Sequence, residues 1–248
     1  MQLLGNAAFT LGMHTLASGF LTASIDTMRD QGRLVQLAQS LVMRAWSEIN
    51  LGRWAVAAPD AEEAGRLTHE TAQPIWEAGA DAAQAFLAGV RGDEDTAEAL
   101  ATRAERVVVP AGGHAVIAAV QLTRGVTALG AGRYADAHRH LLRMLDRADP
   151  AHHRMTFSWA LGNLAESAVR VGETENARAI VAGFEQRAAQ TPSPAFQQAV
   201  RHARAVLADD AEAEALFEAA LDGEIPGGPF ERARLQVAFG ARSEEHNV

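Results

Sequence analysis

The chain has 248 residues and contains no cysteine and no lysine. Without cysteine it can form no disulfide framework, no thiolate metal site and no cysteine nucleophile, and this composition fits a reducing compartment. Because all 22 basic residues are arginine, a P-loop lysine, a Schiff-base lysine and a Ser-Lys dyad are excluded as well. Arginine without lysine in an alanine-rich chain is typical of the high-GC genomes of actinobacteria.

Long hydrophobic runs and an excess of positive charge are also missing. No stretch of about 18 apolar residues is available to cross a membrane. The first five residues lack the charged start and apolar core of a signal peptide, so we expect a cytoplasmic protein. The net charge is −9, and arginines are scattered among more numerous acids, which predicts that the chain does not bind nucleic acid directly.

Aromatic residues make up only 6% of the chain, whereas alanine dominates the apolar 48%. Such a composition favours helix, because alanine loses least on entering one. A 40-residue repeat organises these helices. In five copies a glycine ends a helical stretch, a small residue precedes it by seven positions, and alanine follows it by five. The glycines are Gly12, Gly52, Gly92, Gly132 and Gly172; the small residues are Gly5, Ala45, Ala85, Gly125 and Ala165.

This spacing predicts an all-α, right-handed superhelix of about six tetratricopeptide-like hairpins, forming one domain over residues 1–248. Glycine permits the left-handed cap that ends a helix, and small residues allow two helix axes to cross closely. The first copy should be incomplete. The last copy, from about residue 209, should be irregular because Asp209 and Asp210 replace the glycine. The helices are predicted near 13–30, 33–50, 54–70, 74–90, 94–107, 114–130, 134–147, 152–170, 174–190, 195–208, 210–222 and 229–240.

Four segments resemble the helical region of large LuxR-type (MalT-like) transcriptional regulators. They are Leu51-Gly52-Arg53-Trp54 with Asp60-Ala61-Glu62-Glu63-Ala64, Gly132 to Ala137, Glu166 to Gly172, and Pro229 to Leu235. In that family the region links a nucleotide-binding domain to a helix-turn-helix, and it binds an inducer or a partner protein. The resemblance implies an effector- or partner-binding regulatory domain that works in the concave groove without catalysis. Because neither flanking domain is present in this sequence, we expect either a fragment or a free-standing descendant.

Three acids interrupt the repeat columns. Glu166 stands six residues before its glycine, where the other copies carry Asn6, Trp46, Phe86 and Val126. Glu48 and Asp81 likewise stand in columns whose other members are mostly apolar. In such repeats the first helix of each hairpin usually lines the concave surface. The three acids lie on first helices, so they could receive a cationic or hydroxylated ligand or transfer protons. Pairing with nearby arginines, or exposure to water, is the alternative interpretation. The predicted ligand-binding set is Trp46, Glu48, Trp76, Asp81, Gln84, Arg124, Trp159 and Glu166.

Neither a cofactor nor a metal is predicted. His138 and His140 are two apart on a helix and therefore point to different faces, and no HExxH spacing occurs. No glycine-rich phosphate loop follows a strand. Two other functions stay open beside the regulatory one: a free-standing scaffold that binds proteins or peptides in its groove, and an enzyme or small-molecule binder that uses Glu48, Asp81 and Glu166.

Overall fold

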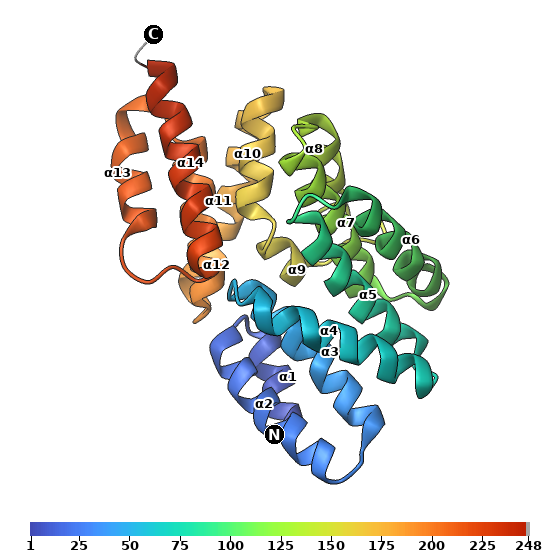
Figure 1. Ribbon diagram of the computed structural model, residues 1–248. Helices are drawn as coiled ribbons and strands as arrows, with labels where there is room; N and C mark the ends of the chain where they lie inside the picture. The colour runs from blue at the N-terminus through green and yellow to red at the C-terminus, as the bar shows by residue number, and fades with distance from the viewer. Residues whose placement is uncertain (247–248) are drawn as a thin grey trace.

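A computed structural model describes residues 1–246, with side chains as far as Arg242; residues 247 and 248 of the predicted domain lie outside it. Over that range the regular structure is all helix, with no strand, and successive helices pack as hairpins along a curved row (Figure 1). The predicted all-α repeat solenoid is confirmed. The helices are α1 (Gln2–Thr10), α2 (His14–Asp30), α3 (Leu34–Asn50), α4 (Trp54–Glu70), α5 (Pro74–Gly89), α6 (Glu94–Ala111), α7 (His114–Gly130), α8 (Tyr134–Arg143), α9 (Arg154–Ser158), α10 (Leu161–Val171), α11 (Thr174–Gln190), α12 (Pro194–Leu207), α13 (Asp210–Leu221) and α14 (Gly228–His246).

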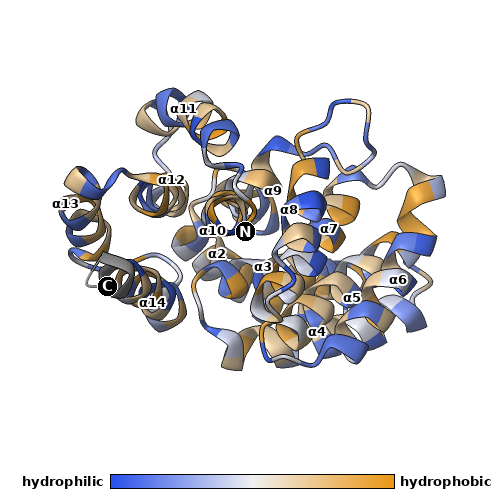
Figure 2. Ribbon diagram, turned by 90° about the horizontal axis from the view of Figure 1, so that it is seen from above, coloured by the Kyte–Doolittle hydropathy of each residue, from blue (hydrophilic) through white to orange (hydrophobic). Residues whose placement is uncertain are grey.

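The first helix of each hairpin is the more deeply buried one. Helices α3, α5 and α7 have buried residues around most of their circumference, whereas α4, α6 and α11 bury only a narrow stripe of mainly small residues. Viewed from above, hydrophilic residues mark the outer sides of α6 and α11 (Figure 2). None of the helices in the described part of the chain is both long and apolar enough to cross a bilayer.

The predicted close crossing within each hairpin is present and follows a size rule. A Cβ on Gly5 would lie 2.6 Å from the Leu21 side chain, and one on Gly125 would lie 2.7 Å from that of Leu141. Leu21 and Leu141 occupy the same repeat position, sixteen residues after the small one. Three copies have alanine at the small position. Two of them carry alanine sixteen residues later too, as the pairs Ala45/Ala61 and Ala85/Ala101, and the third pairs Ala165 with Val181. A small residue opposite a large one, or two medium ones, therefore fills each crossing at native density.

Four predicted helix boundaries are wrong, and one of them is the last, because the helix predicted at 229–240 continues to His246. The helix predicted at 152–170 is broken at Trp159 and Ala160, where each N–H bonds to the carbonyl three residues earlier, so that α9 and α10 run in different directions. The helix predicted at 134–147 ends at Arg143, because the Asp149 carboxylate accepts from Arg143 Nε (2.7 Å) and the Ala151 N–H (2.8 Å) and stabilises a loop. The helix predicted at 94–107 continues to Ala111, with Pro110 inside its last turn.

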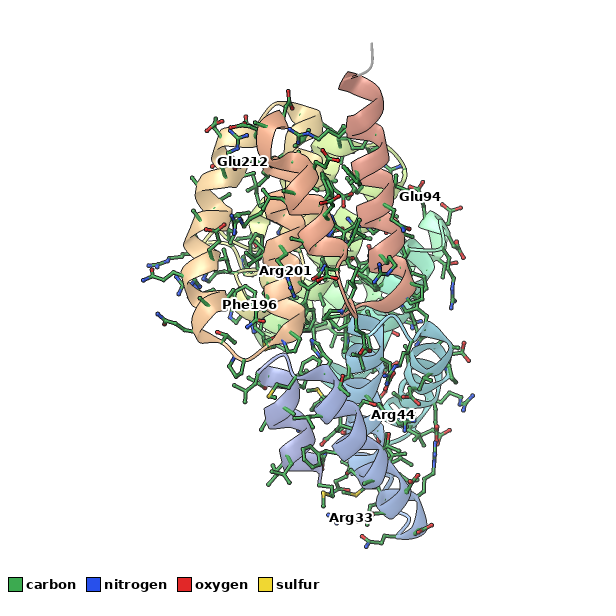
Figure 3. The ribbon with its side chains drawn as sticks, turned by 90° about the vertical axis from the view of Figure 1, so that its left-hand side faces the viewer. Arg33, Arg44, Glu94, Phe196, Arg201 and Glu212 are labelled. Carbon is green, nitrogen blue, oxygen red and sulfur yellow. The ribbon has the colours of Figure 1, made fainter. Side chains whose placement is uncertain are left out.

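The irregular last copy has a clear backbone cause. Ala208 and Asp209 adopt extended conformations between α12 and α13, in place of the left-handed glycine that follows the first helix in earlier copies. Helix α14 follows through the segment 222–227, called the strap below. Arg33 and Glu212 mark opposite ends of the long axis of the molecule in Figure 3.

The solenoid curves until its last hairpins meet its first. Ser193 Oγ donates to the carbonyl of Gly12 at 3.0 Å, and the rings of Trp54 and Phe230 lie 4.6 Å apart. A Cβ on Gly52 would overlap the carbonyl oxygen of Gly227 in the strap. These contacts join residues about 180 positions apart in sequence. The two ends of the array therefore enclose a space on the inner face.

The size rule at the helix crossings predicts that substitutions of Gly125 and Leu141 are strongly coupled in their effect on the free energy of unfolding. Gly125→Ala should destabilise by about 1–3 kcal/mol through overpacking, less a helix-propensity gain of about 1 kcal/mol. Leu141→Ala should cost about 2–5 kcal/mol. The double variant recreates the Ala/Ala pair of other copies. Its loss in the free energy of unfolding should therefore be smaller than the sum of the two single losses, by at least about 1 kcal/mol. Urea unfolding of the four chains measures this, and additivity within about 0.5 kcal/mol would contradict a tight crossing.

The contact between Gly52 and the strap distinguishes two glycines that occupy the same position of the repeat. Gly52 and Gly132 both have positive φ, at 70° and 75°, but nothing lies within 4 Å of a Cβ built on Gly132. Gly132→Ala should therefore cost only the backbone strain, about 1–2 kcal/mol. Gly52→Ala should cost clearly more, because the strap must also move. Thermal unfolding of both variants tests this, and equal losses would show that closure contributes nothing.

Candidate functional site

The enclosed space forms a pocket of about 110 Å³, the central pocket. First helices α3, α5, α7, α10 and α12 supply most of its wall, together with the start of α4, the strap and α14. It is thus the inner face of the solenoid, narrowed by the returning C-terminal hairpin. The lining residues are Trp46, Ile49, Asn50, Trp54, Phe86, Leu122, Val126, Trp159, Asn163, Ala195, Gln198, Ala199, Pro226, Gly227, Phe230, Glu231 and Arg234.

Aromatic rings from four helices and from the turn between α9 and α10 dominate this wall. Trp46 stacks on Trp159 with ring centroids 6.0 Å apart, and Phe86 lies 6.1 Å from Trp46. The Trp54–Phe230 pair is contributed by the two ends that meet. Trp159 reaches the pocket because the chain turns there between α9 and α10. Phe86 and Trp159 also pack against both halves of the hydrophobic core, so the pocket lies where the two halves join.

Two buried polar atoms on the wall have no hydrogen-bond partner among the described residues. They are Oδ1 of Asn163, a residue only 5% exposed, and Nε1 of Trp54. The amide nitrogen of Asn163 points the other way, toward the Trp159 carbonyl at 3.5 Å. An acceptor and a donor thus remain unpaired in an aromatic surrounding, where an unpaired polar group costs about 1–3 kcal/mol. A ligand that supplied a hydrogen bond to either atom would be stabilised there.

A wider opening of about 710 Å³, the outer cleft, shares Ala195, Pro226 and Gly227 with the central pocket. His14 lines it and is 3% exposed, with its ring edge-on to Trp159 at 5.8 Å. Neither ring nitrogen has a hydrogen-bond partner in the described part of the structure. Burial lowers the pKa of His14 to about 4, so the imidazole is neutral at pH 7.

A partly buried group of four charges, the ion cluster, borders the central pocket, and its histidine is fully buried. It consists of Glu166 on α10, His202 on α12, and Glu231 and Arg234 on α14. His202 bonds to Glu231 through Nδ1, and its Nε2 lies 3.0 Å from Glu166. Arg234 pairs with Glu166 and lies 3.7 Å from Glu231. A Cβ on Gly162 would lie 2.7 Å from Nδ1 of His202, so the glycine makes room for the imidazole.

The cluster fixes its protonation states. Burial by itself would lower the pKa of His202, but the carboxylates of Glu231 and Glu166 outweigh it and raise that pKa to about 9. Burial would raise the pKa of Glu231, yet the charges of His202 and Arg234 lower it to about 2. The pKa of Glu166 is lowered for the same reason by Arg234 and His202. At pH 7 two anions therefore face two cations, with no net charge.

The structure brings two of the predicted ligand-binding residues together and distributes the others. Trp46 and Trp159 form the stacked pair of the central pocket. Glu166 belongs to the ion cluster and also lines a cleft of about 660 Å³ beside α14. Glu48 is buried, accepts from Ser18, and lies 3.8 Å from Arg53. These positions follow the rule that buried acids need partners.

The remaining predicted residues serve contacts within a hairpin or between neighbouring hairpins. Asp81 is 2% exposed and holds Arg103, on the second helix of the same hairpin, with two hydrogen bonds. Gln84 donates to the carbonyl of Ala61 at 3.2 Å. Arg124 bonds to Glu98 and Glu105, and Trp76 packs against the N-terminal half of the core. The three predicted acids thus all have arginine partners, as the alternative interpretation of the sequence expected.

Sequence reasoning missed Asn163, His14 and the ion-cluster partners of Glu166. The repeat offered one signal for the position of the pocket. The residues six positions before the glycine in three copies, Trp46, Phe86 and Val126, all line the central pocket. No comparable signal marks His202, because its copy lacks the glycine that sets the register. In the described part of the chain, no group of three or more histidine, aspartate or glutamate side chains is arranged so that it could hold a metal ion.

The ion cluster predicts a loss of stability at alkaline pH. The folded pKa of His202 is raised from 6.5 to about 9, so its contribution is complete below pH 6.5 and disappears as the pH rises through 9. Urea unfolding should show a fall on the order of 3 kcal/mol over this window. His202→Gln should be less stable than the wild type at pH 6, and its free energy of unfolding should no longer fall between pH 6.5 and 9. His69→Gln, an exposed histidine also paired with a glutamate, is the control and should retain this fall. A fall that survives in His202→Gln would refute the assignment.

Comparison of the chain with protein-family models and with curated proteins finds no match in either case. The resemblance to LuxR-type regulators therefore rests on the four short segments quoted above and stays a prediction. What the chain does has to be argued from the central pocket, the outer cleft and the ion cluster.

Proposed function

We propose that this chain is the effector-binding domain of a LuxR-type transcriptional regulator and holds a small molecule in the central pocket without changing it chemically. The four segments that resemble such regulators support the regulatory part of the proposal. One of them, Pro229 to Leu235, contains Phe230, Glu231 and Arg234, which line the pocket.

The observation that carries the binding part is the pair of unpartnered atoms in an aromatic enclosure. Asn163 Oδ1 and Trp54 Nε1 are buried without partners among the described residues, on the wall of a pocket that all five inner helices α3, α5, α7, α10 and α12 help to build. Ligand sites are typically concave and mostly apolar, with a few convergent polar groups. Binding there also bridges the first and last hairpins, which gives an effector a means to change the curvature of the array.

The protonation states favour binding over proton transfer. A general acid or base works best with a pKa near the working pH. The pKa of His14 is about 4, that of Glu231 about 2 and that of His202 about 9, all well away from neutrality. Glu48 and Asp81, the other acids considered for catalysis, form ion pairs with neighbouring arginines.

The proposal predicts that filling the pocket abolishes effector binding. Ala199 lines the pocket, whereas Ala189 is an exposed residue on α11, so Ala199→Phe and Ala189→Phe add the same ring at an inner and an outer site. A low-molecular-weight fraction of a bacterial extract should raise the Tm of the wild type and of Ala189→Phe but not of Ala199→Phe. At a ligand concentration of about 100 times Kd, the stabilisation amounts to about 2.7 kcal/mol.

Two results would count against an effector in this pocket. Stabilisation of all three chains by the small-molecule fraction would place binding elsewhere. Stabilisation by the macromolecular fraction alone would favour a protein partner in the groove instead. Native mass spectrometry of the stabilised chain then gives the mass of the bound molecule.

A further inference from the structure

We propose that the central pocket selects a small, neutral, planar aromatic molecule that carries both a hydrogen-bond donor and an acceptor, as an aromatic carboxamide does. This inference rests on the proposed function, because it names the class of effector for the same pocket. It follows from three features of the wall: paired charges, stacked aromatic rings, and one unpartnered acceptor and one unpartnered donor among the lining residues.

The charges on the wall are already neutralised within the protein. Glu231 is bonded to His202, and Arg234 is paired with Glu166, so neither a cationic nor an anionic ligand finds a free counter-ion. His14 in the outer cleft is neutral as well. Burying an unpaired charge among aromatic rings carries a heavy desolvation penalty. The pocket therefore discriminates against both signs of charge.

The size and the shape of the walls favour a ring. Engineered apolar cavities of about 150 Å³ accept benzene, and the central pocket offers about 110 Å³ with a continuation into the outer cleft. Trp46, Phe86 and Trp159 present ring faces and edges against which a flat molecule can stack. A substituent on the ring can extend past Ala195 and Pro226, which both openings share.

The free polar atoms decide the substituent. Asn163 Oδ1 requires an N–H or O–H, and the indole N–H of Trp54 requires an oxygen or nitrogen lone pair. The other amides on the wall each have one N–H engaged: Asn50 donates to the Trp46 carbonyl at 2.8 Å, and Gln198 donates to that of Ala220 at 2.9 Å. A carboxamide supplies one carbonyl oxygen and two N–H donors without a charge, so it offers a partner of the kind that each unpartnered atom lacks.

Four probes of similar shape test this selectivity: benzamide, benzamidinium, benzoate and toluene. Isothermal titration at pH 7, with intrinsic tryptophan fluorescence as a second readout, measures each Kd on the full chain. Benzamide should bind at least about tenfold more tightly than benzamidinium, benzoate or toluene. The charged probes fail through desolvation, and toluene fails because it leaves the two polar atoms unpaired.

Two variants assign the polar contacts. Trp54→Phe keeps the ring next to Phe230 but removes the N–H, and Asn163→Leu removes the acceptor at similar volume. Each should weaken benzamide about 3- to 10-fold, the usual effect of one lost hydrogen bond, and leave toluene unchanged or tighter. Gln197→Leu, at an exposed position of α12 outside the pocket lining, is the control and should change neither. If Asn163→Leu does not fold, Trp54→Phe alone carries the test.

The outcomes separate this inference from the proposed function. If toluene or a charged probe binds as tightly as benzamide, the pocket still binds ligands but the neutral carboxamide class is wrong. If benzamide binds and neither variant changes its affinity, the polar assignment is wrong. If no probe binds, the inference is overturned, and the proposed function is then decided by the Ala199→Phe experiment.

Discussion

The close approach of the two ends of the solenoid is the constraint on which the rest of the structure depends. Gly12 and Gly52 carry no side chain at the points where Ser193 and the strap arrive, and Trp54 packs on Phe230 beside them. Open solenoids present a broad concave surface to solvent. Here the same surface is narrowed to a pocket of about 110 Å³, because the terminal hairpins pack against each other across it.

The packing of the C-terminal helices determines the electrostatics of the inner face. Glu166, His202, Glu231 and Arg234 come from α10, α12 and α14, and they are partly buried together with balanced charge. A buried ion group contributes little net stability, but it penalises any arrangement that leaves one member unpaired. The cluster is therefore best understood as fixing the position of α14 over the pocket. Helix α14 then contributes Phe230 and the neutralised wall that give the pocket its preference for uncharged molecules.

The break between α9 and α10 has a similar role for the aromatic wall. A continuous helix over these residues would carry Trp159 away with the regular repeat. The turn instead directs its ring onto Trp46, Phe9 and His14. The departure from the repeat thus coincides with the candidate site, as expected when local regularity is given up for a specific contact. The effector-binding role proposed for the chain depends on this departure as much as on the repeat itself.

The sequence by itself determined the helical hairpins, because the glycine register, the small residues at the crossings and the alanine-rich stripes are local patterns with a period of 40 residues. It also identified Trp46 and Trp159 as candidate lining residues. Only the tertiary structure decided which repeat glycines touch another part of the chain, which arginines neutralise Glu48, Asp81 and Glu166, and where Asn163 and His202 lie. These contacts join residues tens of positions apart or more, and their geometry accumulates from small rotations between successive hairpins. A repeat pattern specifies each hairpin and its neighbour, but it does not specify where the array meets itself.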